Sequence, residues 1–225
     1  MRRAGSGQAE EARIALERLC QTYWYPLYCC VRRHGHQPSD AEDVTQAFFE
    51  KLLRTNAIEE ADQERGRFRT YLLRSLERFL HNQHRDATAQ KRGAGQVVSW
   101  DAQTAEERYA ADPSDGLSPE RLFEKQWAAA TVYAVMEKLR AEFVDGGKGE
   151  LFDELEPHLW SDETSTPYGE LSEHLHMTVV ALRVTVHRLK RRFLEMLRSE
   201  VAETLETPEL LEDELAHLTR ALSAG

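Results

Sequence analysis

The sequence has few cysteines and no long apolar run, and each lack excludes a class of protein. Its three cysteines, Cys20, Cys29 and Cys30, are an odd number within one short segment, so they make no disulfide framework. No stretch approaches the roughly 20 continuous apolar residues of a membrane helix. The basic residues in segment 1–7 precede no apolar run of the kind found in signal peptides. We therefore expect a cytoplasmic protein without a membrane partner.

Motifs of the common enzyme classes are also missing. The sequence has no phosphate-binding loop, no G-x-S-x-G and no H-E-x-x-H. Among its nine histidines, His81 and His84 can share a helix face, but no nearby set of cysteines or carboxylates completes a metal site. We expect no catalytic residue, no cofactor and no metal, and an enzyme is kept as an alternative.

Strand patterns are nearly absent, and helical periodicity dominates instead. Val44, Phe48 and Leu52 recur every four residues and predict one buried stripe. The predicted fold is all-α, with two small helical domains joined by a flexible linker, the second a helix-turn-helix. Helices are expected at about 9–33, 40–54, 67–84, 120–143, 149–159, 167–175, 179–203 and 207–222.

Composition divides the chain into four predicted segments. Residues 1–90 form the first helical domain, and residues 91–119 form a linker rich in Ala, Gly, Gln, Asp and Ser, with one apolar patch at 96–100. Residues 120–203 form the second helical domain. Residues 204–225 form an acidic helical extension, whose leucines recur at 211, 215, 218 and 222 and must pack on this protein or on a partner.

Charge is unevenly distributed along the chain. The formal net charge is −10, which by itself argues against nucleic-acid binding. Residues 64–92, however, carry eight Lys/Arg against three Asp/Glu, and residues 183–198 carry six against one. Local basic stripes are typical of nucleic-acid binding, although two solvated helix faces would give the same counts.

The segment 166–192 predicts a DNA-reading pair of helices. Thr178 is expected to cap the second helix, whose first half would enter the major groove. Arg183 suits a bidentate contact with guanine, whereas Val179 and Val180 favour apolar contact with thymine methyl groups. The candidate residues are Thr178, Val179, Val180, Arg183, Val184, His187, Arg188, Lys190 and Arg191. A structural helical hairpin is the alternative.

Two N-terminal features suggest further surfaces. On helix 40–54, Asp43 and Gln46 lie away from the apolar stripe and would face a partner or solvent. In segment 64–74, arginines alternate with Phe68 and Tyr71, a mixture that suits unstacked bases and backbone phosphates. For Phe68, a place in the core is the alternative.

These segments resemble a known family. The N-terminal part reads WYPLY at 24–28, RRHG at 32–35, DAEDVTQAFF at 40–49 and FRTYL at 68–72. The C-terminal part reads YGELSEHLHM at 168–177 and ALRVTVHRLKRR at 181–192. In this order, they resemble the two conserved domains of extracytoplasmic-function (ECF) sigma factors of the sigma-70 family, over roughly residues 10–90 and 120–200.

The resemblance implies a non-enzymatic factor that binds core RNA polymerase and directs promoter-specific transcription initiation. By match, the clamp helices of the largest polymerase subunit would contact Glu42, Asp43, Gln46, Phe49 and Glu50. The −10 element would be melted and read by Gln63, Arg65, Arg67, Arg69, Tyr71, Arg74 and Arg78, with a flipped base against the loop 62–67. The −35 element would be read by the candidate residues of segment 178–191.

The expected partners are therefore the polymerase core and promoter DNA, and an anti-sigma factor is a further candidate partner. A monomer is expected in the free state. Two non-enzymatic alternatives stay open at this point. The first is a one-component helix-turn-helix regulator that binds DNA without polymerase. The second is a helical interaction protein with no role at DNA.

Overall fold

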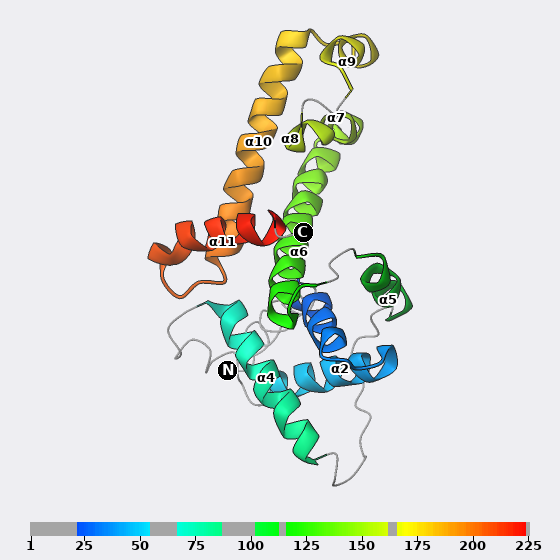
Figure 1. Ribbon diagram of the computed structural model, residues 1–225. Coiled ribbons are helices and arrows are strands. Elements are labelled where there is room, and N and C mark those ends of the chain that lie inside the picture. Colours follow the sequence, from blue (N-terminus) through cyan, green and yellow to red (C-terminus); the bar gives the residue numbers. More distant parts are fainter. Residues whose placement is uncertain (1–21, 55–66, 87–101, 113–115, 162–165, 224–225) are drawn as a thin grey trace, which may run out of the picture. The chain divides into compact units, whose positions relative to one another are not determined.

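The computed structural model describes residues 22–54, 67–86, 102–112, 116–161 and 166–223 (Figure 1). Within these ranges the chain forms helices and short connections without a strand, which confirms the all-α prediction. One isolated antiparallel bridge pairs Arg67 with Leu205. None of the helices in the described ranges combines the length and the apolar character needed to cross a membrane.

The chain divides into two compact units. Unit 1 comprises Met1–Ala130 and Thr204–Gly225, and unit 2 comprises Thr131–Glu203. The first boundary lies within helix α6 (Pro119–Asp145), so the start of this helix belongs to unit 1 and the rest to unit 2. The C-terminal extension therefore groups with the N-terminal part of the chain. The four functional segments inferred from composition stay a prediction.

Unit 1 is built on a helix at 22–33, α2 (Pro38–Arg54) and α4 (Phe68–Asp86). The first of these ends before Gly35, whose φ of 94° is a conformation that glycine adopts without strain. The predicted stripes face the core: the buried leucines and aromatic residues include Val44, Phe48, Leu52, Leu72, Leu76 and Leu80. Residues 9–21 of the predicted first helix lie outside the described residues.

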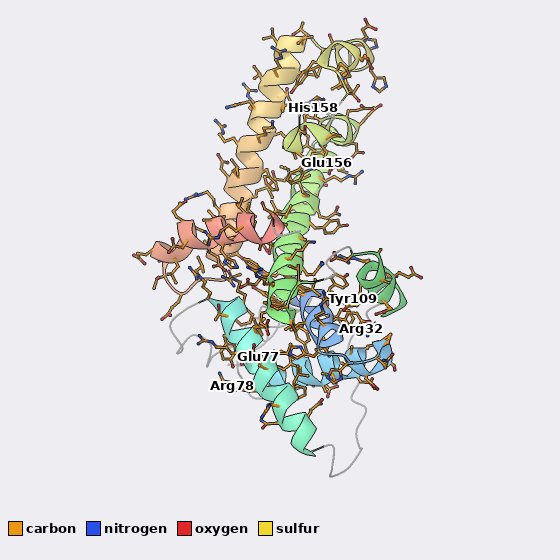
Figure 2. The ribbon with its side chains drawn as sticks, in the orientation of Figure 1. Arg32, Glu77, Arg78, Tyr109, Glu156 and His158 are labelled. Carbon is orange, nitrogen blue, oxygen red and sulfur yellow. The ribbon has the colours of Figure 1, made fainter. Side chains whose placement is uncertain are left out.

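Helix α5 (Ala102–Ala111) lies inside the segment predicted to be a flexible linker. Hydrogen bonds and a cation–π contact join it to helix 22–33. Glu106 accepts hydrogen bonds from Tyr28, at 2.6 Å, and from Arg32, at 2.7 and 2.8 Å, and Arg32 also lies over the ring of Tyr109 (Figure 2). Among the side chains of α5 that the structure describes, the buried apolar groups include only the small one of Ala105, so the sequence shows no apolar stripe that would predict a helix here. The predicted linker thus contains a docked helix, and the patch at 96–100 lies outside the described residues.

Unit 2 contains the second part of α6 together with α7 (Gly149–Leu155), α8 (Pro157–Trp160), α9 (Tyr168–His174) and α10 (Val179–Ala202). Helices α6 and α10 run antiparallel, because Lys138 pairs with Glu200 while Glu142 pairs with Arg192. The predicted helix 149–159 is divided at Glu156, since Pro157 begins a new helix. The buried core of the unit includes Val135, Leu139, Phe152, Leu155, Leu171, Leu182, Val186, Leu189 and Phe193.

The C-terminal extension forms a short 3₁₀ turn (Pro208–Leu210) followed by α11 (Leu211–Ser223). Of the four predicted leucines, Leu218 is buried, Leu211 and Leu215 are half-buried, and Leu222 is 41% exposed, so the buried side of the helix is centred on Leu218 and Ala221 instead. Glu214 is also buried, although it is charged. Burial of a carboxylate on the packed side of a helix requires a cationic partner, which α4 supplies.

Candidate nucleic-acid and protein interfaces

Helices α9 and α10 are joined by a tight turn of residues 175–178. Thr178 caps α10, because its Oγ1 accepts a hydrogen bond from the Ala181 N–H at 3.2 Å. His176 has a φ of 51°, and the Met177 N–H donates to the Ser172 carbonyl at 3.2 Å. This is the hydrogen bond by which a helix ends in a Schellman motif. The predicted N-cap of α10 is confirmed, whereas Pro167 occupies the N-cap position of α9 and provides no side-chain hydrogen bond.

The outer face of α10 mixes apolar and cationic side chains. Val180 is 72% exposed and Val184 is 44% exposed, unusually high values for valine in a packed helix. Arg183 and His187 are exposed one turn apart, beside the two valines. Most of the predicted DNA-reading side chains are therefore accessible on one helix, while Val179 and Lys190 are half-buried.

Arg183 has a neighbour that the sequence did not indicate. Its guanidinium carbon lies 5.4 Å from the centroid of the Tyr168 ring on α9. Tyr168 also packs on His158, with ring centroids 4.5 Å apart. His158, labelled in Figure 2, is buried in α8. An aromatic face beneath a guanidinium attracts it and restricts its position.

Farther along α10, the cations divide into two groups. Arg188 and Arg191 are exposed. Arg192 instead donates a hydrogen bond to Glu142 on α6 with its Nε at 3.0 Å, and a second with its Nη2 at 2.5 Å. These bonds raise the pKa of Arg192 and lower the pKa of the Glu142 carboxyl. Arg192 therefore contributes to the packing of unit 2. Arg191 lies 3.5 Å from Glu195 on the same helix in an exposed ion pair, so its guanidinium stays on the surface.

On α2, the predicted protein-binding residues separate into two classes. Asp43 is exposed, and Glu42, Gln46 and Glu50 are half-buried on the helix surface. Phe49 is only 2% exposed and lies with its ring 6.2 Å from that of Phe48. Phe49 therefore belongs to the core together with Phe48, and its predicted contact with a partner stays a prediction.

Helix α4 presents part of the predicted basic surface. Arg74 and Arg78 are exposed, and Figure 2 labels Arg78 beside Glu77. Tyr71 is half-buried, with its ring 6.3 Å from that of Phe68. Gln63, Arg65 and the rest of the predicted base-flipping loop before Arg67 lie outside the described residues.

The start of α4 differs from the prediction. The side chain of Arg69 is 6% exposed, and its Nε lies 2.5 Å from Oε1 of Glu214 while its Nη1 lies 2.8 Å from Oε1 of Glu124. Arg67 places its Nε 2.7 Å from Oε2 of Glu214. Arg69 is one of the predicted −10 DNA contacts, and here it is buried in ion pairs, because α6 and α11 bring carboxylates to it.

The sequence patterns indicate no site role for Glu124, Glu214 or Tyr168. For Glu214 a signal existed, since it lies three residues after Leu211 and four before Leu218, on the apolar side of its helix. An acidic residue at such a position predicts a buried ion pair, although not which cation supplies it. In the part of the chain that the structure describes, no three His, Cys, Asp or Glu side chains gather as metal ligands.

Comparison with known proteins gives one result. Neither a search of curated proteins nor a search of solved structures yielded a match. Among protein-family models, the model described as sigma-70 region 2 matches residues 22–90, which include α2 and α4. This match, over less than half of the chain, supports a sigma-70 family member with a role in transcription by RNA polymerase.

Proposed function

We propose that this protein is a sigma factor of the ECF subfamily, which binds core RNA polymerase and directs promoter-specific transcription initiation. The observation that carries the proposal is the match of residues 22–90 to sigma-70 region 2. The unmatched C-terminal part supplies independent support. It holds a two-helix element with a tight turn and a second helix whose exposed face is basic.

In this proposal, α2 is the polymerase-binding helix. Its apolar side is buried in unit 1, and Asp43 and Gln46 lie on the surface with Glu42 and Glu50. These acidic and amide groups would meet the clamp helices of the largest polymerase subunit. Electrostatic complementarity of this kind sets orientation and the rate of encounter. Phe49 supports the surface from within the core and makes no contact of its own.

Helix α4 is proposed to read the −10 element as single-stranded DNA. Arg74 and Arg78 are exposed along the helix and would contact backbone phosphates. Tyr71, half-buried beside Phe68, offers an aromatic edge for an unstacked base. The flipped base would sit against the loop 62–67. Extruding a base from the duplex costs a few kcal/mol, which the contacts with α4 and this loop must offset.

Helix α10 is proposed to read the −35 element in the major groove. Arg183 would contact guanine, and the exposed Val180 and Val184 would contact thymine methyl groups. Arg188 and Arg191 would bind phosphates, which adds affinity without sequence preference. The exposed valines favour this role over that of a structural hairpin, since apolar groups at a solvent-facing position gain by contact with a partner.

The charge distribution suggests how the parts act together. The net charge of −10 opposes DNA binding by the free chain, so the polymerase would supply much of the affinity at a promoter. In this proposal, the free protein is a cytoplasmic monomer, and an anti-sigma factor is a candidate partner.

Reconstituted transcription with purified core RNA polymerase tests the function directly. The protein should bind core enzyme and direct initiation from a discrete set of promoters, read by sequencing the 5′ ends of the transcripts. Failure to bind core enzyme would refute the proposal. Tight, sequence-specific DNA binding by the free protein, with no effect of polymerase, would identify a one-component regulator instead.

A further inference from the structure

The cation cluster at the start of α4 is enclosed by the C-terminal part of the chain. Glu214 on α11 is 1% exposed, and its carboxylate oxygens pair with Arg69 on α4 and with Arg67 just before it. Oε1 and Oε2 lie 2.5 and 3.2 Å from nitrogens of Arg69, and Oε2 lies 2.7 Å from Nε of Arg67. This is the two-pronged contact that guanidinium groups make with carboxylates and phosphates.

A second layer of contacts holds Arg69 from the side of α6. Glu124 pairs with its Nη1, and the guanidinium carbon lies 5.1 Å from the ring centroid of buried Trp127. Glu124 also lies 3.2 Å from Nε2 of His217 on α11. Arg69 therefore has two carboxylates and an aromatic face around it, which leaves no room for a ligand on its guanidinium.

The backbone is also engaged at this point. Arg67 and Leu205 form the isolated antiparallel bridge, and the Phe68 N–H donates to the Thr204 carbonyl at 3.3 Å. Together with the burial of Leu218, these contacts fix the C-terminal segment across the first turn of α4. We name residues 204–223 the C-terminal latch.

We infer that the C-terminal latch is an autoinhibitory element, which occupies the arginines of the −10 DNA surface and is displaced by single-stranded DNA. The inference rests on the proposed function, because Arg67 and Arg69 belong to a −10 DNA surface only if the protein is a sigma factor. The two states exclude each other at Arg69, because its guanidinium is buried against Glu214 and cannot reach a phosphate there. Arg67 is more exposed, but a phosphate would have to replace the same carboxylate on its Nε. The latch suits this role chemically, since it carries five acidic residues and one arginine and so resembles a polyanion.

Competition for the same side chains makes the effect reciprocal. If the latch weakens DNA binding by a given factor, DNA weakens latch docking by the same factor. The arginines thereby link the docking of α11 to the occupation of the DNA surface. The exposed cations Arg74 and Arg78 on the same helix remain available for a first, weaker encounter with DNA.

The test uses the full chain without polymerase and a fluorescent single-stranded DNA oligonucleotide, with affinity measured by anisotropy. Glu214→Gln removes the central charge at nearly constant shape, and Leu218→Ala loosens the latch without touching any charge. We expect each to bind the DNA about tenfold tighter than the unchanged protein. The exposed positions Asp213→Asn and Leu222→Ala are the matched controls and should leave the affinity unchanged.

Salt dependence and hydrogen exchange give two further readouts. Two freed arginines should steepen the slope of log affinity against log salt by about 1.4, or roughly 0.7 for each phosphate contacted by single-stranded DNA. Adding Arg69→Ala to Glu214→Gln should cancel the gain in affinity. In the unchanged protein, addition of DNA should speed amide hydrogen exchange across residues 211–223.

Two results would overturn the inference. One is faster exchange of the latch in Glu214→Gln and Leu218→Ala with no gain in DNA affinity. The other is unaltered exchange and unaltered affinity in both variants. Run-off transcription separates these failures from that of the proposed function. If the unchanged protein initiates transcription while the variants gain no affinity, only the latch is refuted. If the unchanged protein never binds core enzyme while the variants gain DNA affinity, the autoinhibitory latch is supported and the proposed sigma function is refuted.

Discussion

Arg183 and Tyr168 form a cation–π pair across the turn between α9 and α10, with the guanidinium carbon 5.4 Å from the ring centroid. Tyr168 is in turn supported by the ring of buried His158. The side chain proposed to read guanine is therefore held by a residue of the preceding helix. Such pairs contribute about 0.5–1 kcal/mol at exposed sites.

The first prediction concerns this support. Tyr168→Leu should weaken binding of the polymerase–protein complex to promoters with the preferred −35 element by roughly two- to fivefold, because Arg183 loses its platform. Tyr168→Phe keeps the ring and should retain affinity. The measurement is competition binding against a scrambled −35 element, with the exposed Tyr133→Leu as control. An equal loss on both DNA sequences would contradict a positioning role.

The second prediction concerns the polymerase surface. Asp43→Ala should weaken binding to core RNA polymerase by about tenfold, the effect of losing one charged contact of roughly 1.4 kcal/mol. Since Asp43 is exposed, the thermal midpoint of unfolding should stay the same. Asp40→Ala, one turn earlier and also exposed, is the control. Unchanged core affinity in the Asp43 variant would remove this residue from the interface.

The third prediction separates Phe49 from that surface. Phe49 is buried, so Phe49→Ala should lower the free energy of unfolding by about 3–5 kcal/mol, measured by urea denaturation. The folded fraction should bind core polymerase with the affinity of the unchanged protein. A specific loss of core affinity with unchanged stability would show instead that Phe49 leaves the core to reach the partner.

The fourth prediction concerns two adjacent thiols. Burial raises the pKa of Cys29 to about 12, and burial likewise raises the pKa of Cys30. Because the thiolate is the reactive form, both thiols should resist alkylation at neutral pH until the protein unfolds. The measurement is mass spectrometry after iodoacetamide treatment of the Cys20→Ser variant, with and without denaturant. Rapid alkylation of the native variant would contradict the burial of both residues.

The fifth prediction follows from His217 in the C-terminal latch. Burial, with Arg69 and Arg220 nearby, lowers the pKa of His217 against the opposing effect of Glu124 and Glu214. Because the folded-state pKa of His217 is lower than its ordinary value, the imidazole is protonated in the unfolded chain at a higher pH than in the folded protein. As the pH falls below the ordinary pKa, protonation therefore favours the unfolded chain and the free energy of unfolding decreases. Between roughly pH 7.5 and roughly pH 5.5, His217→Gln should reduce the fall in thermal midpoint. An identical pH profile would remove His217 as the cause.

The helices of this protein are largely predictable from its sequence because their signals are local. The stripe of Val44, Phe48 and Leu52 and the Thr178 cap each depend on residues within two turns of one another. Helix α5 was not predicted, because the hydrogen bonds that hold it join Glu106 to Tyr28 and Arg32, which lie more than 70 residues away in the sequence. Ion pairs of this kind leave no periodic pattern in the sequence.

The candidate site shows the same contrast. Exposure of Val180, Val184 and Arg183 on α10 follows from helical geometry once the buried stripe is known. The burial of Arg69 does not, because its partner Glu214 lies 145 residues farther along the chain. The charge count over 64–92 treats every arginine as available, whereas the fold pairs two of them, Arg67 and Arg69, with the carboxylate of Glu214.

The antiparallel bridge between Arg67 and Leu205 also has a consequence for the order of folding. Unit 1 is assembled from two separate stretches of sequence, and the whole of unit 2 intervenes between them. During synthesis, α4 leaves the ribosome long before residue 204 does, and such a distant contact closes late. A nascent chain would thus present Arg67 and Arg69 uncovered until residues 204–223 have also been made.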